Sequence, residues 1–269
     1  MCTVTVVPGV ATGGSAGGDR LRFRLVCNRD EQRGRARSTK LVRCTLGRHT
    51  VVMPVDPESG GTWIGANSTG LVACLLNANP GAHEQRGHGL PGCRSRGEIV
   101  PTALEADSTD DAIERLRELN AQEFPPFRLL LLDEHTHAIG TSGGASLTWS
   151  VKSVLEQPLV LTSSGLGDAL VEPARRELFA RMFADASDPL EAQARYHGHF
   201  WPAETRLSVL MSRPDARTVS RTSIDVLANH IALRHGRLDD ELLAEAVSLE
   251  QLDIEHSRLA PHIRERSNA

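Results

Sequence analysis

Hydrophobic and polar positions alternate over the first residues of the chain in a pattern typical of β-strands. Residues 2–7 (CTVTVV) and 21–27 (LRFRLVC) are alternating or β-branched, and the glycine-rich stretch 9–19 lies between them. Such glycine runs form flexible connections, and neither a GK[ST] sequence nor a helix start follows that would indicate phosphate binding. We therefore expect two antiparallel strands joined by a long loop.

The next region predicts two more hairpins. Residues 39–55 indicate two strands around Gly47, and residues 60–81 indicate a short strand, a turn at Asn67–Gly70 and a second strand. This second strand ends at Asn77, so we expect a side-chain amide at the edge of the sheet.

The spacing of apolar residues changes to helical periodicity in several later segments. Residues 107–120 have apolar residues at helical spacing behind an Asp/Ser cap, and residues 171–185 are amphipathic. Further helices are expected at residues 95–100, 190–200 and 239–259.

Two other regions, residues 126–164 and 206–238, predict strands joined by turns, with two or three strands in the second region. Strands thus occur in antiparallel blocks separated by helices, which excludes a Rossmann or TIM arrangement and indicates an α+β fold. The chain of 269 residues is long enough for one large domain, and we assign residues 1–269 to it.

Composition narrows the classes of function. The formal net charge is −4, with 34 acidic and 30 basic residues, so no broad cationic surface for nucleic acid is expected. The sequence contains no run of about 18 apolar residues, so we expect no membrane span. The first residues lack the basic and apolar segments of a signal peptide. We expect a cytoplasmic protein that binds neither nucleic acid nor membrane and acts on a small molecule.

The cysteines give little support for a structural framework. Their number is odd and no CxxC spacing occurs, which argues against disulfides and against a zinc knuckle. They are Cys2, Cys27, Cys44, Cys74 and Cys93. Most are expected to be buried thiols that pack as small hydrophobic groups.

Cys2 differs from the other cysteines because it follows the initiator methionine. Removal of Met1 would leave an α-amino group with a pKa of roughly 7.7–8.0 beside the thiol, so nucleophile and base would share one residue. Residues 28–31 (NRDE) end the strand expected to pair with that of Cys2. There Arg29 would lower the pKa of the thiol and Asp30 would hold the amine. The same pattern is compatible with a cysteine that merely begins a strand.

Several motifs, in this order, resemble the NRDE family, also called the transport and Golgi organisation 2 proteins. They are MCTV at residues 1–4, NRDE at 28–31, GGTWIGAN at 60–67, LLN at 75–77 and SRGE at 95–98. Such proteins are similar to N-terminal nucleophile (Ntn) hydrolases, including the choloylglycine hydrolase and penicillin V acylase group. The resemblance implies a four-layer αββα sandwich of two antiparallel sheets between helix layers.

The resemblance also implies roles for individual residues. Cys2 would be the nucleophile, and Arg29 and Asp30 would set its ionisation and orientation. Asn77 would donate a hydrogen bond to the oxyanion. From the residues alone, Asn77 is equally compatible with a turn at the end of a strand.

Two positions of the acylase group are less clearly matched. That group has a late arginine, for which Arg221 is the candidate, although Arg217 lies in the same stretch. Where the group has an asparagine after a strand, this chain has Ser163 and Ser164, which leaves the second oxyanion donor open.

The sequence therefore predicts a cysteine Ntn amidohydrolase that cleaves a non-peptide C–N bond of a small acylated substrate without a cofactor or metal. The alternative is a non-catalytic carrier of haem or acyl lipid on the same scaffold. The pairs His135/His137 and His197/His199 lack a third ligand at metal-binding spacing. A homodimer is compatible with either reading.

Overall fold

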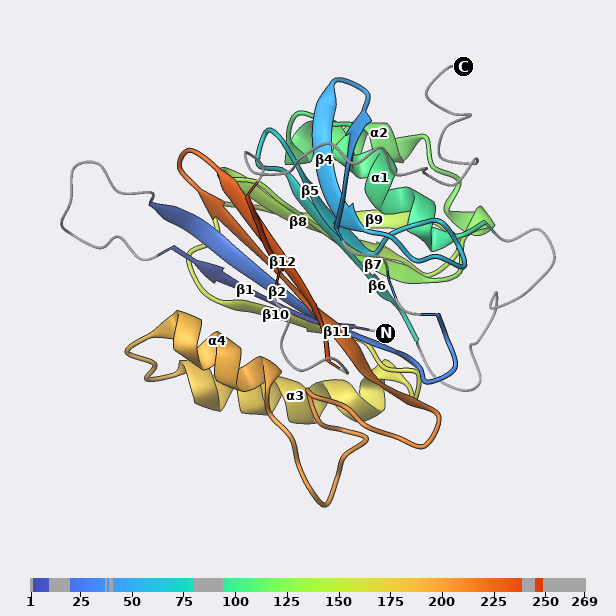
Figure 1. Ribbon diagram of the computed structural model, residues 1–269. Helices are drawn as coiled ribbons and strands as arrows, with labels where there is room; N and C mark the ends of the chain where they lie inside the picture. Colours follow the sequence, from blue (N-terminus) through green and yellow to red (C-terminus); the bar gives the residue numbers. More distant parts are fainter. Residues whose placement is uncertain are drawn as a thin grey trace. The chain divides into compact units, whose positions relative to one another are not determined.

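The computed structural model describes residues 2–9, 20–36, 38, 41–79, 94–238 and 245–248. Over these residues the chain divides into two compact units, each built around one antiparallel sheet (Figure 1). Unit 1 comprises residues 1–35, 79–84 and 156–246, and unit 2 comprises residues 36–78, 85–155 and 247–269. The expected combination of antiparallel sheets with helices is confirmed, whereas assignment to a single domain stays a prediction.

The sheet of unit 1 has six strands in the order β10-β1-β2-β11-β12-β13. Their bounds are β1 Cys2–Pro8, β2 Leu21–Gln32, β10 Leu159–Thr162, β11 Ala216–Leu227, β12 Ile231–Arg237 and β13 Glu245–Ser248. The predicted hairpin of β1 and β2 is confirmed, and β10 pairs with the other side of β1. The strand that begins at Cys2 is therefore internal to the sheet.

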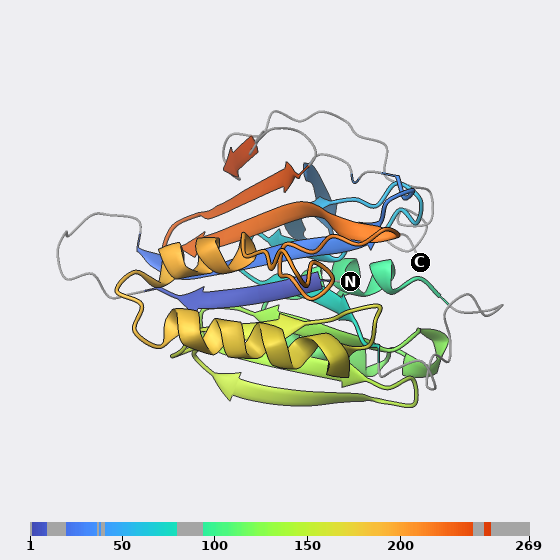
Figure 2. The same cartoon turned by 90° about the horizontal axis from the view of Figure 1, so that it is seen from below.

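Two helices cover one face of this sheet (Figures 1 and 2): α3 at Asp168–Phe183 and α4 at Pro189–His197. Asp188 caps α4 by accepting hydrogen bonds from two backbone N–H groups of its first turn. Apolar side chains fill the space between sheet and helices; they are Val160, Leu178, Phe179, Tyr196 and Val209. Both helices were expected at these segments.

Of the two or three strands expected in residues 206–238, the structure has two, β11 and β12. Residues 206–212 precede β11 and bond to core side chains instead: Arg175 donates to the carbonyls of Leu207 and Ser208, and Asn28 to that of Val209. A helix was expected over 239–259, but β13 lies within it and the remainder lies outside the described residues.

Unit 2 contains a seven-stranded sheet in which neighbours in sequence are neighbours in space, β3 to β9. The strands are β3 Leu41–Leu46, β4 His49–Pro54, β5 Ile64–Asn67, β6 Val72–Asn77, β7 Phe127–Leu132, β8 Thr136–Ser142 and β9 Leu147–Ser153. The expected hairpins around Gly47 and at Asn67–Gly70 are confirmed. Gly70 has a φ of 94°, a conformation that favours glycine in this turn.

The helices of unit 2 follow β6. They are the 3-10 turn η1 Arg96–Glu98, the helices α1 Ile99–Leu104 and α2 Thr109–Arg117, and the 3-10 turn η2 Ala121–Glu123. Ser95 caps η1 through its side chain, and Pro101 is accommodated because it lies in the first turn of α1. Apolar residues of α1 and α2 join those of the sheet in one buried cluster.

A buried polar contact joins α4 to β1 and β2 in unit 1. The Nε2 atom of His197, at the end of α4, lies 2.7 Å from Oγ1 of Thr5, and its carbonyl accepts hydrogen bonds from Asn28 and Arg221. Burial, together with the guanidinium groups of Arg221 and Arg175, holds the pKa of His197 well below its ordinary value. His197 is therefore neutral in the folded protein.

His197 should make the fold sensitive to mild acid. Below its unfolded-state pKa of about 6.5 the unfolded chain takes up a proton that the folded chain does not, so the free energy of unfolding falls with falling pH. For this residue the fall approaches about 1.4 kcal/mol per pH unit. Urea denaturation at pH 7 and pH 5 should show a smaller fall for His197→Gln than for wild type; equal falls would contradict the assignment.

Candidate functional site

Strand pairing places four residues in one row across the sheet of unit 1. Cys2 on β1 pairs with Arg29 on β2, and Arg29 pairs with Ser220 on β11. On the other side of β1, the backbone N–H of Ser163 donates to the carbonyl of Cys2 at 2.8 Å. Paired residues of antiparallel strands project to the same face. Cys2, Arg29 and Ser220 therefore share a face, with Ser163 beside them.

This face is the one opposite α3 and α4. The neighbouring residues Thr3 and Asn28 bond to Arg175 of α3 and to the carbonyl of His197 of α4, so they face the helices. Because side chains alternate along a strand, Cys2 and Arg29 point away from the helices.

Cys2 is held closely at the start of β1. The residue is 4% exposed, and its backbone N–H donates to Oγ of Ser163 at 3.1 Å. A hydrogen bond with Cys27, burial, and the charge of Asp30 raise the pKa of the Cys2 thiol well above its ordinary value. The thiol is therefore protonated near neutral pH.

The Cys2 thiol was expected to have a lowered pKa beside Arg29, whereas its pKa is raised. The Arg29 guanidinium pairs with Glu31, with 3.1 Å between Nη2 and Oε2, so a carboxylate offsets its charge. The hydrogen bond with Cys27, followed by burial of the sulfur, instead sets the direction of the shift in the pKa of Cys2. Arg29 nevertheless provides a cation on the same face as the thiol, 6% exposed.

Asp30 lies on the helix-facing side, behind Cys2. It is 1% exposed, accepts a 2.6 Å hydrogen bond from Oγ1 of Thr218, and has its Oδ2 atom 3.9 Å from Nη1 of Arg175. Burial raises the pKa of Asp30, while Arg175 and the Thr218 hydrogen bond act in the opposite direction. The charge of Asp30 reaches Cys2, because it contributes to the raised pKa of the thiol.

Arg175 is fully buried and organises this side of the sheet. Its Nη1 donates to Oγ1 of Thr3 at 2.7 Å and to Oγ1 of Thr162 at 2.9 Å, in addition to its bonds to the carbonyls of Leu207 and Ser208. It thus ties β1, β10 and the segment after α4 to α3. Sequence reasoning missed it, although its spacing from buried Val171 and Leu178 places it on the inward face of the helix.

The remaining predicted residues differ in how they lie with respect to the sheet of unit 1. Arg221 donates to Oδ1 of Asn28 at 2.9 Å and to the carbonyl of His197 at 2.6 Å, so it lies on the helix-facing side. Asn77 ends β6 in unit 2, and its role as an oxyanion donor stays a prediction. Of the two candidate serines, Ser163 contacts Cys2, whereas the N–H of Ser164 donates to Asp168.

Two residues on the same face as Cys2 were not singled out from the sequence. Cys27 precedes Arg29 by two positions, so strand alternation places it on the same face as Cys2, and the two thiols are hydrogen-bonded. Ser220 is 1% exposed, and within the part of the chain that the structure describes its hydroxyl has no hydrogen-bond partner. Ser220 therefore carries a buried hydroxyl in register with Arg29.

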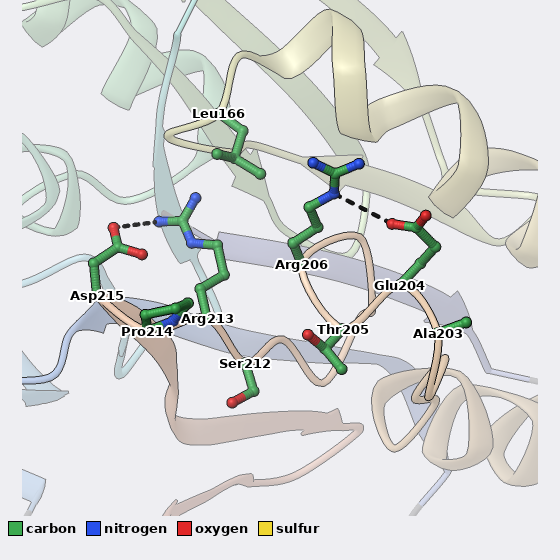
Figure 3. Close-up of a pocket in the computed structure, with 9 residues that line it drawn as sticks. All are labelled: Leu166, Ala203, Glu204, Thr205, Arg206, Ser212, Arg213, Pro214 and Asp215. Atoms are coloured by element: carbon green, nitrogen blue, oxygen red, sulfur yellow. Dashed lines mark hydrogen bonds and ion pairs between the residues drawn. The ribbon is translucent and has the colours of Figure 1, made fainter.

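A cavity of about 510 Å³ lies at the same end of the sheet (Figure 3). Leu166 in one wall follows the end of β10, and residues 212–215 in another wall precede the start of β11. Both of these strand ends lie at the edge of the sheet where β1 begins. Two paired guanidinium groups line the cavity: Arg206 with Glu204 and Arg213 with Asp215. Its walls mix apolar and polar side chains, and their charges balance.

The described ranges contain no group of three or more His, Cys, Asp or Glu residues that could hold a metal ion. In the same ranges, no helix has the length and apolar character needed to cross a membrane.

The two antiparallel sheets with their helices match the fold of the Ntn hydrolases. Penicillin V acylase from Agrobacterium tumefaciens is similar, with 17% identity, a TM-score of 0.52, and coverage of 94% of this chain and 87% of that one. The C2A mutant of conjugated bile acid hydrolase from Clostridium perfringens has 11% identity, a TM-score of 0.56, and coverage of 94% of each chain.

The chain belongs to the Transport and Golgi organisation 2 family, whose model matches residues 9–179. The mouse (Mus musculus) Transport and Golgi organization 2 homolog is 28% identical over 180 residues, which are 64% of this chain and 60% of the mouse protein. The match thus spans less than two thirds of that relative.

Loss of Arg175 should destabilise unit 1 strongly. Arg175→Met leaves the buried Asp30 carboxylate without its cation, and removal of one partner of a buried ion pair costs about 3–5 kcal/mol. Adding Asp30→Asn should recover part of this loss. The matched control is Arg176→Met on the exposed side of α3, whose ion pair with Glu172 should contribute less than about 1 kcal/mol. Urea denaturation measures all four proteins; equal losses for Arg175→Met and Arg176→Met would contradict the argument.

Proposed function

We propose that the protein is a cysteine Ntn amidohydrolase that cleaves a non-peptide C–N amide bond of a small acylated molecule. One observation carries the proposal: Cys2 begins an internal strand and is paired directly with Arg29, while Asp30 lies behind it. Removal of Met1 would place a free amine within this group. The bile acid hydrolase with the same fold was studied as a C2A mutant, so it too has cysteine at position 2.

The raised pKa of Cys2 determines how attack would begin. Because the thiol is protonated, its proton must leave as the sulfur attacks the amide carbonyl, and the neutral α-amino group of Cys2 is the base for it. This amine would be held by Oγ of Ser163, which accepts from the same nitrogen in the structure. Asp30 would stabilise the ammonium that forms.

The reaction then proceeds through a thioester. The ammonium returns its proton to the leaving nitrogen, the C–N bond breaks, and the amine departs. Water, deprotonated by the same α-amino group, attacks the thioester carbonyl and releases the carboxylic acid, while the sulfur regains its proton. No net oxidation occurs, and one water is consumed.

The negative charge on the tetrahedral oxygen requires donors on the face of Cys2. Arg29 supplies a cation there. Ser220 pairs with Arg29 across the strands, and its hydroxyl, which has no hydrogen-bond partner among the described residues, is the second proposed donor. Asn77 of unit 2 is a further proposed donor, as the family resemblance implies.

The proposal requires both the sulfur and a free amine at residue 2. Intact mass should show that Met1 is absent, and N-acyl amines should give an acyl adduct on Cys2 that hydroxylamine removes. Cys2→Ala should abolish turnover. An extension ahead of Cys2, which keeps the thiol but removes the free amine, should lower kcat about 10²–10⁴-fold.

The matched control is Cys74→Ser, which changes a buried thiol of unit 2 and should retain activity. Hydrolysis that survives Cys2→Ala would overturn the proposal. Absence of hydrolysis together with haem binding that is lost in Cys2→Ala would instead favour the carrier function.

Ser220→Ala separates catalysis from stability. If its hydroxyl donates to the oxyanion, the substitution should lower kcat about 10²-fold. The free energy of unfolding should stay within about 0.5 kcal/mol of wild type or rise, because a buried hydroxyl without a described partner is removed. Steady-state kinetics and urea denaturation test the two halves, and an unchanged kcat would remove Ser220 from the mechanism.

A further inference from the structure

A second thiol lies beside the candidate nucleophile. In the register of β1 and β2, Cys2 is opposite Arg29 and Cys27 is opposite Val4, so the two cysteines are diagonal neighbours on one face. Both are buried, with exposures of 4% and 0%, and their thiols are hydrogen-bonded to each other. The arrangement is a buried dithiol.

The other described cysteines have no comparable neighbour. Cys44 lies on β3 and Cys74 on β6, both in unit 2, and strands β4 and β5 separate them. Among the cysteines that the structure describes, proximity therefore selects Cys2 and Cys27.

We propose that Cys2 and Cys27 form a reversible disulfide when the protein reacts with a hydroperoxide. The Cys2 sulfur attacks the peroxide, whose O–O bond breaks, which gives a sulfenic acid on Cys2 and an alcohol or, from hydrogen peroxide, water. The Cys27 thiol then displaces hydroxide from that sulfur, so the S–S bond forms and one water leaves. The two thiols are oxidised, and the peroxide is reduced.

The position of Cys2 allows this bond to close. Diagonal neighbours in a sheet are about 7–8 Å apart, slightly farther than the usual Cα separation in a disulfide, so one residue must move. Cys2 is the first residue of β1. On the side of β1 toward β10, its backbone N–H and its carbonyl both bond to one residue, Ser163. A small shift of the strand end is therefore sufficient, and the strained bond should be readily reduced.

The disulfide would remove the sulfur that the proposed hydrolysis requires. The consequence for activity rests on the proposed function, but formation of the bond does not. Oxidation should be slow, because burial and the hydrogen bond with Cys27 raise the pKa of the Cys2 thiol and leave little thiolate.

The test uses the full chain, reduced and then exposed for hours to excess hydrogen peroxide. Peptide mapping by mass spectrometry should find residues 2 and 27 linked, with a loss of two hydrogens, and dithiothreitol should restore both thiols. Cys27→Ser should instead accumulate oxygen on Cys2 that dithiothreitol does not remove. Cys27→Ala provides the same comparison if the serine variant folds poorly, and Cys74→Ser should behave as wild type.

A wild-type protein in which Cys2 acquires oxygen without a link to Cys27, or in which no thiol is oxidised, would overturn the proposal. So would a disulfide that joins other cysteines. None of these readouts uses a substrate, so a link that forms in a protein without hydrolase activity would contradict the proposed function alone. Where activity is present, its loss and recovery should follow the disulfide.

Discussion

The pairing of β1 with β2 is the constraint on which the rest of unit 1 depends. With Cys2 opposite Arg29, strand alternation sends the sulfur and the guanidinium to one face and Thr3, Asn28 and Asp30 to the other. A slip by one residue would exchange these sets. The register is fixed on the helix side, where Thr3, Thr162 and Asp30 all converge on the single guanidinium of Arg175.

A buried cation contributes little net stability to the packing of a sheet against helices, because the free-energy cost of desolvation opposes the attraction between the charges. Arg175 donates four hydrogen bonds, to two hydroxyls and two carbonyls, with Asp30 nearby, and such bonds are the condition under which a buried charge is tolerated. The same contacts that stabilise the sheet also place Asp30 behind Cys2. Stability and the geometry of the site therefore share one set of interactions.

Sequence patterns located the hairpins correctly because alternation and turn residues are local signals, as at Gly47 and Gly70. They also placed Arg29 beside Cys2, since that contact follows from pairing two adjacent strands. They did not reveal that the carbonyls of Leu207 and Val209 bond to Arg175 and Asn28 from distant segments. The direction of the Cys2 pKa was wrong for the same reason: burial and the neighbour Cys27 depend on the tertiary structure.

The contact between Cys2 and Ser163 joins residues 161 positions apart. During synthesis, therefore, the start of β1 can pair with β2 long before β10 has left the ribosome, and the β10 side of Cys2 gains its partner only later. The two sides of β1 thus become occupied at different stages of synthesis.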